Sequence, residues 1–423
     1  MIFLFYFFAA VLILLSFKSF RGGLEYLRFI KAELSKLKSN FTPFVSVIAP
    51  CRGLDAGLKE NLLSLFEQDY PAYEIIFVVD NESDDAVPTI KELLNRRDAE
   101  TQSKKSEGSN SVSASLRFCG ENQVAGRLVI APKADGSSQK VENLREAVLH
   151  TADESQIFIF VDSDARPSKD WLRSLVAPLQ DKTVGAATGY RWFISEHPSF
   201  ASEMRSAWNA SIASALGPNT KTNFCWGGSM AICRDVFDEV KMREKWRGTL
   251  SDDFAVTRAM NEAGRPIVFV PQALTASVED CTCGELLEFT TRQMKITRVY
   301  APHLWLLSFF GSTVFNAVMI AAFLIVVLSR TNNFALFAAM TTLIFVTTCS
   351  IGKSWLRLNA VKLVLTEYKT ELGRQFLTQN TLWLLTPALF LYNSIAAWAS
   401  RRLTWRGITY ELKSAGETVI ITD

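Results

Sequence analysis

Long hydrophobic stretches stand near both ends of the chain. Residues 1–18 are almost wholly hydrophobic, with Lys18 as the first charged side chain, which predicts a transmembrane helix. Residues 304–350 contain two uncharged runs separated by a short polar segment, and they predict a transmembrane hairpin. Residues 379–400 predict a further transmembrane or re-entrant helix, because Pro387 would allow a turn there. We therefore expect an integral membrane protein.

Basic side chains set the expected orientation. They follow the first hydrophobic stretch and none precedes it, so residues 19–42 are expected to form a basic cytoplasmic linker. Residues 351–378 mix Lys and Arg with leucine and valine, which is typical of an amphipathic segment on the membrane surface. Residues 401–423 form the C-terminal tail. Because the tail begins with basic residues, residues 379–400 are compatible with either a transmembrane or a re-entrant helix. The expected location is a bacterial-type inner membrane or an equivalent one.

Residues 43–303 have the alternating pattern of an α/β domain. Short β-rich runs alternate with helical patterns, which predicts a mostly parallel, doubly wound sheet. Residues 97–126 have little hydrophobic content and predict a long polar loop. The strand-like runs are 45–50, 74–79, 127–131 and 156–161, and the clearest helical patterns are 57–68 and 139–151.

Net charge, cysteine spacing and a missing motif argue against several classes of protein. The net charge of the 423 residues is only +2, so no global basic field supports nucleic-acid binding. The seven cysteines have irregular spacing, which indicates free thiols rather than a disulfide framework. No G-x-G-x-x-G follows the first strand-like run, which argues against a nicotinamide-dependent dehydrogenase.

Acidic side chains follow two of the predicted strands. Asp162 and Asp164 come directly after one strand, and Asp80 follows another. Parallel strands present their carboxyl ends at one edge of the sheet, where ligands bind in such folds. Two carboxylates separated by one serine can share a hard divalent cation, Mg²⁺ or Mn²⁺, beside a substrate diphosphate. Solvated turns or helix caps would explain the same residues without any function.

Two further motifs have both a structural and a functional interpretation. Ser251 precedes a helical pattern and is suited to cap it, with Asp252 as an alternative cap, while a remaining carboxylate such as Asp253 could act as a general base. Trp226, Gly227 and Gly228 would allow close approach of a ligand, or would form a tight turn into a strand.

The ordered motifs resemble those of family 2 and family 21 glycosyltransferases, especially ceramide glucosyltransferase-like enzymes. The resemblance covers roughly residues 43–305 together with the flanking membrane segments. It implies a GT-A-like domain with N- and C-terminal transmembrane helices. The matching motifs, in chain order, are Pro50-Cys51-Arg52-Gly53-Leu54-Asp55, Gln68-Asp69-Tyr70-Pro71, Lys140-Val141-Glu142-Asn143-Leu144, Asp162-Ser163-Asp164, Trp226-Gly227-Gly228-Ser229-Met230 and Ser251-Asp252-Asp253.

The resemblance also implies roles for individual residues. It makes Asp253 the catalytic base with Asp252 beside it, and Asp162 and Asp164 the metal ligands. A last family signature, (Q/R)-x-x-R-W, is degenerate here, because Lys295 stands for the second arginine and the tryptophan is absent. Arg292 and Lys295 would then bind the donor diphosphate, or form a basic face of an interfacial helix. The implied donor-binding set is Asp80, Lys140, Asn143, Asp162, Arg292 and Lys295, and the implied acceptor-binding set is Trp226, Gly227 and Gly228.

These features together predict an inverting, metal-dependent glycosyltransferase. It would move a hexose from a nucleotide sugar, most simply a UDP-hexose, to a hydroxyl of a membrane lipid, with its catalytic domain in the cytoplasm. The sequence does not distinguish among ceramide, diacylglycerol, a polyprenyl phosphate and a hopanoid as the acceptor lipid. The alternatives are a processive polysaccharide synthase, which would need more membrane helices, and an inactive scaffold that binds a nucleotide sugar.

Overall fold

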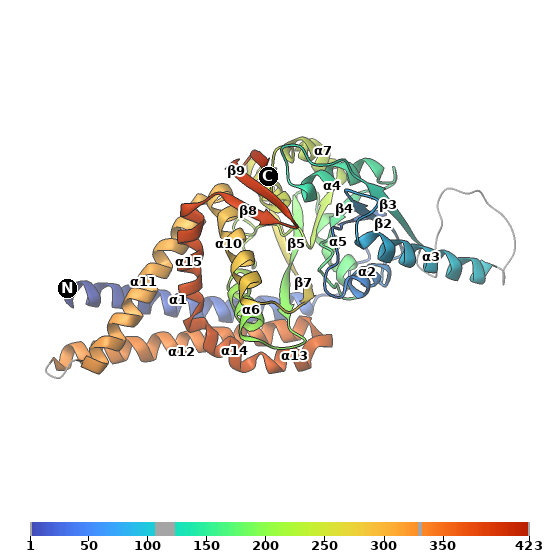
Figure 1. The fold of residues 1–423 in the computed structure, drawn as a ribbon. Coiled ribbons are helices and arrows are strands. Elements are labelled where there is room, and N and C mark those ends of the chain that lie inside the picture. The colour runs from blue at the N-terminus through green and yellow to red at the C-terminus, as the bar shows by residue number, and fades with distance from the viewer. Residues whose placement is uncertain (1, 106–122, 329–331, 422–423) are drawn as a thin grey trace. The chain divides into compact units, whose positions relative to one another are not determined.

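The computed structural model describes residues 2–105, 123–328 and 332–421, and these fall into two units. The α/β unit contains Glu33–Phe193, Leu216–Glu279 and Arg402–Asp423. The helical unit contains Met1–Ala32, Ile194–Ala215 and Asp280–Arg401. Each unit therefore combines segments that are distant in the sequence (Figure 1).

The α/β unit is built on a seven-stranded sheet with the order β3-β2-β1-β4-β6-β5-β7. Strands β3, β2, β1 and β4 pair in parallel, whereas β6 runs antiparallel to both β4 and β5. The predicted mostly parallel α/β sheet is confirmed, with β6 as the exception. The strands are β1 (Val45–Pro50), β2 (Ala72–Val79), β3 (Gln123–Ile130), β4 (Ile157–Phe160), β5 (Ala186–Ile194), β6 (Met230–Cys233) and β7 (Ile267–Val278).

Helices cover this sheet and supply its core. The Tyr73 hydroxyl donates to the Leu65 carbonyl at 2.8 Å, and Phe66 packs on Phe77, so α2 lies against β2. Near the other end of the sheet, the buried Trp171 indole donates to the Ser229 hydroxyl at 2.8 Å. The helices of this unit are α2 (Leu58–Phe66), α3 (Ala86–Lys105), α4 (Gln139–Ala147), α5 (Trp171–Val176), α7 (Arg234–Glu239), α8 (Met242–Lys245) and α9 (Asp252–Glu262).

The end of the chain forms a second, three-stranded antiparallel sheet, β8 (Arg402–Trp405), β9 (Ile408–Ser414) and β10 (Glu417–Ile421). Arg406 and Gly407 make the turn between β8 and β9, with φ of 51° and 77°. Two residues with positive φ match the twist of a tight hairpin, and glycine adopts this conformation at little cost. The buried Tyr410 hydroxyl accepts a hydrogen bond from the Gln139 backbone N–H at 3.2 Å, which ties the hairpin to α4.

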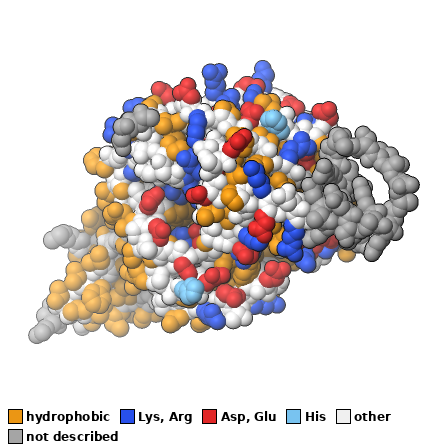
Figure 2. Space-filling view, turned by 45° about the vertical axis from the view of Figure 1, so that its right-hand side comes forward, with side chains coloured by type: hydrophobic (Ala, Val, Ile, Leu, Met, Phe, Trp, Pro, Cys, Tyr) orange, Lys and Arg blue, Asp and Glu red, His pale blue; other side chains and the backbone are white. Residues whose placement is uncertain are grey.

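In the part of the chain that the structure describes, three helices of the helical unit are long and apolar enough to cross a membrane: α1 (Ile2–Leu34), α11 (Pro302–Leu328) and α12 (Asn333–Val364). A fourth candidate is a pair bent by 56°, Phe376–Leu384 with Thr386–Ala399, which is either a broken span or a re-entrant loop. Figure 2 shows hydrophobic side chains gathered at the lower left and charged side chains scattered elsewhere. The remaining helices are α6 (Phe200–Ala213), α10 (Cys283–Tyr300), α13 (Lys369–Arg374), α14 (Phe376–Thr381) and α15 (Thr386–Ala399).

Two predictions near the membrane segments are wrong. The segment 19–42 is not a linker throughout, because α1 continues to Leu34. The segment 351–378 is not a separate amphipathic element, because α12 continues to Val364. Lys, Arg, Glu and Leu are good helix formers, so a helix can leave the hydrophobic layer without a break.

A prediction of irregular structure is also wrong. The polar loop over 97–126 is shorter than expected, because α3 extends to Lys105 and β3 begins at Gln123, while residues 106–122 lie outside the described residues. Arg, Glu, Lys and Ala are good helix formers, so a polar composition of this kind is compatible with a helix as well as with a loop. The tail over 401–423 is largely sheet.

Candidate active site

Lys140 joins two acidic motifs at the carboxyl edge of the sheet. Its ammonium lies 2.7 Å from Asp162 Oδ1 and 3.1 Å from Asp252 Oδ1. Local sequence explains the placement, because Asp162 follows β4 while Ser138 and Ser251 cap the helices that begin with Gln139 and Asp252. Burial opposes the charge on Lys140, yet Asp162, Asp252 and Asp253 hold its pKa above the ordinary value. Lys140 therefore stays cationic.

The two neighbouring carboxyls differ in their electrostatics. Burial also disfavours the charge on Asp162, but Lys140 and Arg191 hold the pKa of Asp162 below its usual range. Burial raises the pKa of Asp252 to about 6, and Asp253 and Asp162 add to this effect while Lys140 opposes it. Asp252 Oδ2 is buried and has no hydrogen-bond partner. The Lys140 ammonium thus lies between one carboxyl whose pKa is lowered and one whose pKa is raised.

Arg191 connects the second aspartate of the D-x-D motif, Asp162-Ser163-Asp164, to the segment 226–228, which we call the tryptophan loop. Its guanidinium lies 3.0 Å from Asp164 Oδ2 and stacks 4.8 Å from the centre of a Trp226 ring. Tyr190 packs on the same indole at 5.5 Å. Arg191 is the only charged residue in β5, and a lone arginine in an otherwise buried strand is the signal that could have identified it from the sequence.

Asp162 and Asp164 fit a divalent cation only in combination with a substrate. Among the described residues, no group of three or more His, Cys, Asp or Glu side chains could hold a metal ion by itself. Asp164 Oδ1 is nevertheless buried without a partner, and burial, reinforced by Asp162, raises the pKa of Asp164 to about 6. Carboxylate oxygens suit Mg²⁺ and Mn²⁺, and such ions commonly complete their coordination with substrate phosphates.

Asp253 lies in the first turn of α9, next to the tryptophan loop. Its Oδ1 accepts from the Phe254 backbone N–H at 2.7 Å and from the Ser251 hydroxyl, and its Oδ2 lies 3.4 Å from the Gly227 backbone N–H. Ser251 is the cap of the helix, since its side chain accepts from the Phe254 N–H. The helix is therefore capped without Asp252, and among the described residues the Gly227 N–H gives Asp253 Oδ2 a single, long hydrogen bond.

Gly227 lets the tryptophan loop lie close to Asp252 and Lys140. A Cβ at this position would collide with Asp252 Oδ2 and would lie 2.8 Å from Lys140 Nζ. At Gly228 a Cβ would collide with the Trp226 ring. These glycines therefore allow close packing within the protein, and their predicted role toward an acceptor stays a prediction.

We expect Gly227→Ala to lower the free energy of unfolding of the full chain by about 1–3 kcal/mol, because an extra carbon is forced into a closely packed site. Gly217→Ala is the matched control, since a Cβ there meets nothing within 4 Å. Denaturant unfolding of both variants in the same detergent measures the difference. Equal stabilities would contradict the packing at Gly227.

Asp80 lies in a separate cluster at the end of β2. Its Oδ2 lies 2.5 Å from Arg52 NH1 and 2.9 Å from Lys133 Nζ. Burial would raise the pKa of Asp80, but Lys133 and Arg52 together hold it below the usual value. Arg52 Nε also donates to the Arg406 carbonyl at 3.0 Å, so Asp80 is linked to the turn of the C-terminal hairpin.

Arg406 reaches the D-x-D motif through Asp55. The Arg406 guanidinium pairs with Asp55 Oδ1, and the Ser163 hydroxyl donates to Asp55 Oδ2 at 2.5 Å. Burial opposes the charge on Arg406, but Asp55, Asp164 and Asp162 hold its pKa above the ordinary value. Sequence reasoning missed this residue. The signal for it was a glycine, Gly407, between two short alternating stretches, although the preceding Arg406 is not a usual hairpin residue.

Asn143, Arg292 and Lys295 are the remaining candidates for donor binding. Asn143 is buried in α4, where its amide contacts the Gln139 side chain at 2.9 Å and the Val78 carbonyl at 3.5 Å. Arg292 and Lys295 lie on α10 of the helical unit. The Arg292 guanidinium lies 3.9 Å from Glu288 and stacks on Phe289. Their proposed contact with a donor stays a prediction.

Comparison with known proteins identifies the family. The chain is similar to a mannosyltransferase of Pyrobaculum calidifontis, PcManGT, solved with GDP-Man and Mn²⁺, at 18% identity and a TM-score of 0.42, over 93% of this chain and 98% of that one. It is also similar to GalNAc-T7, solved with UDP, GalNAc and Mn²⁺, at 14% identity and a TM-score of 0.38, over 58% of this chain and 45% of that one. Residues 9–109 and 122–418 match Glycosyl transferase family 21, and the chain is a glycosyltransferase that belongs to this family.

Proposed function

We propose that this protein transfers a hexose from a UDP-sugar to a hydroxyl of a membrane lipid, with inversion at the anomeric carbon. The observation that carries the proposal is the bridge made by Lys140 between Asp162 and Asp252, since it unites the two acidic motifs in one site. Asp253 supplies a base beside this bridge. The helices long enough to cross a membrane favour a lipid acceptor.

In the proposed reaction, Asp253 takes the proton of the acceptor hydroxyl as its oxygen bonds to the anomeric carbon. The bond from that carbon to the diphosphate oxygen breaks, and the electron pair leaves with UDP. Asp253 is suited to this role because its Oδ2 is held by only one long contact. A single base with no second nucleophile gives one displacement and therefore inversion.

The basic side chains would hold the diphosphate. Lys140 and Arg191 each contact one aspartate of the D-x-D motif, and Arg406 is paired with Asp55. A divalent cation held by Asp162 and Asp164 would offset the charge that grows on the leaving diphosphate. Asp80, with Arg52 and Lys133, would contact the uridine end of the donor. The basic side chains after the first hydrophobic stretch favour a cytoplasmic site.

The test is UDP release by the purified full chain, with and without Mn²⁺ and with and without extracted membrane lipids. The expected result is metal-dependent release that rises when lipids are added, together with a hexosylated lipid in the mass spectrum. A polymeric product would indicate a processive synthase. Release of no UDP under any condition would indicate a scaffold.

We expect Arg406→Gln to lower kcat/KM for the UDP-sugar by about 10- to 100-fold, because a hydrogen bond to a charged group contributes about 1.5–3 kcal/mol. Arg402→Gln is the matched control, since Arg402 lies in the same hairpin and forms an exposed pair with Glu411 at 3.4 Å. Steady-state kinetics of both variants measure the effect. A kcat/KM equal to that of the unsubstituted protein would remove Arg406 from the donor site.

A further inference from the structure

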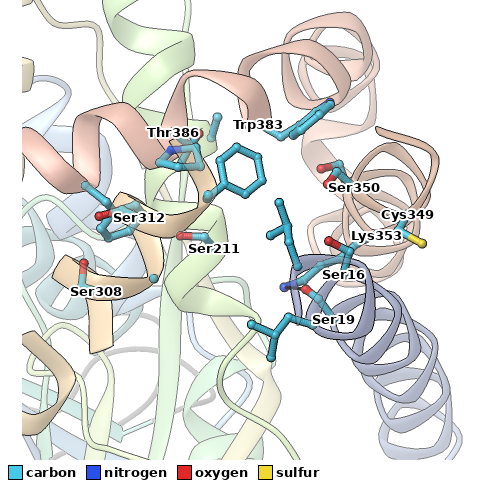
Figure 3. A pocket seen from close by; sticks show the side chains of 18 of the residues that line it. Ser16, Ser19, Ser211, Ser308, Ser312, Cys349, Ser350, Lys353, Trp383 and Thr386 are labelled. Atoms are coloured by element: carbon cyan, nitrogen blue, oxygen red, sulfur yellow. Dashed lines mark hydrogen bonds between the residues drawn. The ribbon is translucent and has the colours of Figure 1, made fainter. Parts of the chain in front are cut away.

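The helical unit contains a cavity of about 520 Å³. Its walls come from α1, α6, α11, α12 and the bent segment that contains α14 and α15. Figure 3 shows Ser16, Ser19 and Lys353 on one side of the cavity and Ser308 and Ser312 of α11 on the opposite side. All lining residues belong to this one unit, so the cavity does not depend on the α/β unit.

Two basic side chains lie one helical turn apart on the α12 wall. Lys353 Nζ donates to the Ser19 hydroxyl at 2.9 Å. Arg357 is only 5% exposed, and one of its terminal nitrogens donates to Gln379 Oε1 at 3.3 Å. The Nε of Arg357 is buried without a hydrogen-bond partner. Both cations are thus held by neutral groups.

No acidic side chain is among the residues that line this cavity, all of which the structure describes. Glu203 of α6 is engaged elsewhere, since it accepts from the Thr378 hydroxyl. Burying a cation without a counter-charge is costly, and a second cation one turn away adds to that cost. An anion bound between Lys353 and Arg357 would relieve both effects.

The rest of the lining suits an amphiphile. The lining contains serine and threonine hydroxyls together with leucine and aromatic side chains. Leu304 and Leu307 belong to the lining and are 45% and 70% exposed, so the cavity opens to the hydrophobic surface of α11. Helices α1, α11 and α12 are long enough to cross a membrane, so this opening would meet lipid chains.

We propose that this cavity binds an anionic membrane lipid. The phosphate of its headgroup lies between Lys353 and Arg357, where it accepts hydrogen bonds from the ammonium, the guanidinium Nε and the neighbouring hydroxyls. Its alkyl chains run along Leu12, Leu307 and Phe315. Basic pockets between membrane helices are suited to such headgroups.

Thermal unfolding of the full chain in a neutral detergent tests this proposal. Phosphatidylglycerol should raise Tm by about 3 °C, because a ligand that binds only the folded state stabilises it. Phosphatidylcholine with the same acyl chains should raise Tm much less. Inorganic phosphate should leave Tm unchanged, because it lacks the alkyl chains. An equal rise with phosphatidylcholine, or with inorganic phosphate, would overturn the assignment of an anionic lipid.

Substitutions locate the effect in the cavity. The double variant Lys353→Met with Arg357→Gln should lose the rise caused by phosphatidylglycerol, yet should unfold no earlier than the unsubstituted protein without lipid, because the charges removed lack counter-charges. Arg357→Lys should keep most of the rise, since it keeps the charge. Lys362→Met is the matched control, because Lys362 lies on the same helix outside the cavity lining. A full rise in the double variant would contradict the proposal.

The result is independent of the proposed reaction. Asp253→Asn changes the α/β unit, so it should leave the rise with phosphatidylglycerol intact even where transfer is lost. Loss of the rise in this variant would show that lipid stabilisation acts through the α/β unit, and it would overturn a site confined to the helical unit.

Discussion

Asp253→Asn is expected to reduce hexosyl transfer by about 10²- to 10⁴-fold, the usual contribution of a general base. Asparagine keeps the size of the side chain and can still accept hydrogen bonds at the start of α9, so the fold should be retained. It cannot take a proton from the acceptor hydroxyl. Single-turnover transfer to lipid measures the loss, and titration with UDP should give nearly the affinity of the unsubstituted protein.

Asp238→Asn is the control for this variant, because Asp238 is an exposed aspartate on α7 of the same unit. It should leave transfer unchanged. If Asp253→Asn transferred at the normal rate, the base would have to be sought at Asp252, whose pKa is raised to about 6 mainly by burial. Loss of both transfer and UDP affinity would instead indicate that Asp253 helps to hold the donor.

Asp164→Asn is expected to weaken Mn²⁺-dependent UDP binding by about 100-fold or more, since even the residues that support metal ligands contribute about 10- to 100-fold. The physical reason is the buried Oδ1 of Asp164, which has no partner within the protein and is free for a cation. Calorimetric titration of UDP in the presence and absence of Mn²⁺ measures the change.

The control for this second variant is Asp153→Asn, at an exposed aspartate of the same unit. Its Mn²⁺ dependence should equal that of the unsubstituted protein. If Asp164→Asn bound UDP with unaltered Mn²⁺ dependence, the D-x-D motif would not be the metal site. The pairing of Asp164 with Arg191 would then be a structural contact only.

The parts of the fold with strong local signals could be predicted from the sequence. The β-rich runs before Asp80 and Asp162 are strands, since short hydrophobic runs that end in polar residues have few other solutions. The sequence also indicates Ser251 as one of two possible N-caps of α9, because helix capping depends only on neighbouring residues. Helix ends near the membrane were predicted less well, because residues 19–34 prefer helix while their charges suggested a linker.

Lys140 was among the predicted donor-binding residues, but the two arginines of the site could not be predicted in the same way. Arg191 and Arg406 meet the acidic motifs only through tertiary structure, the first across the sheet and the second from the end of the chain. The (Q/R)-x-x-R-W signature is degenerate in the sequence, and no other segment indicates which arginine and tryptophan take its place. In the α/β unit, Arg191 stacks on Trp226, so an arginine and a tryptophan do lie beside the D-x-D motif, although they come from other segments.

The contact between Arg406 and Asp55 joins residues 351 positions apart, one near the start of the α/β unit and the other beyond the last hydrophobic helix. During synthesis, Asp55 leaves the ribosome long before Arg406. This contact therefore cannot form until the hydrophobic helices that precede Arg406 have been made. A chain that ended after α15 would contain the hydrophobic helices but lack Arg406, so under the proposed function it would hold the donor diphosphate less well while its helices are still being assembled.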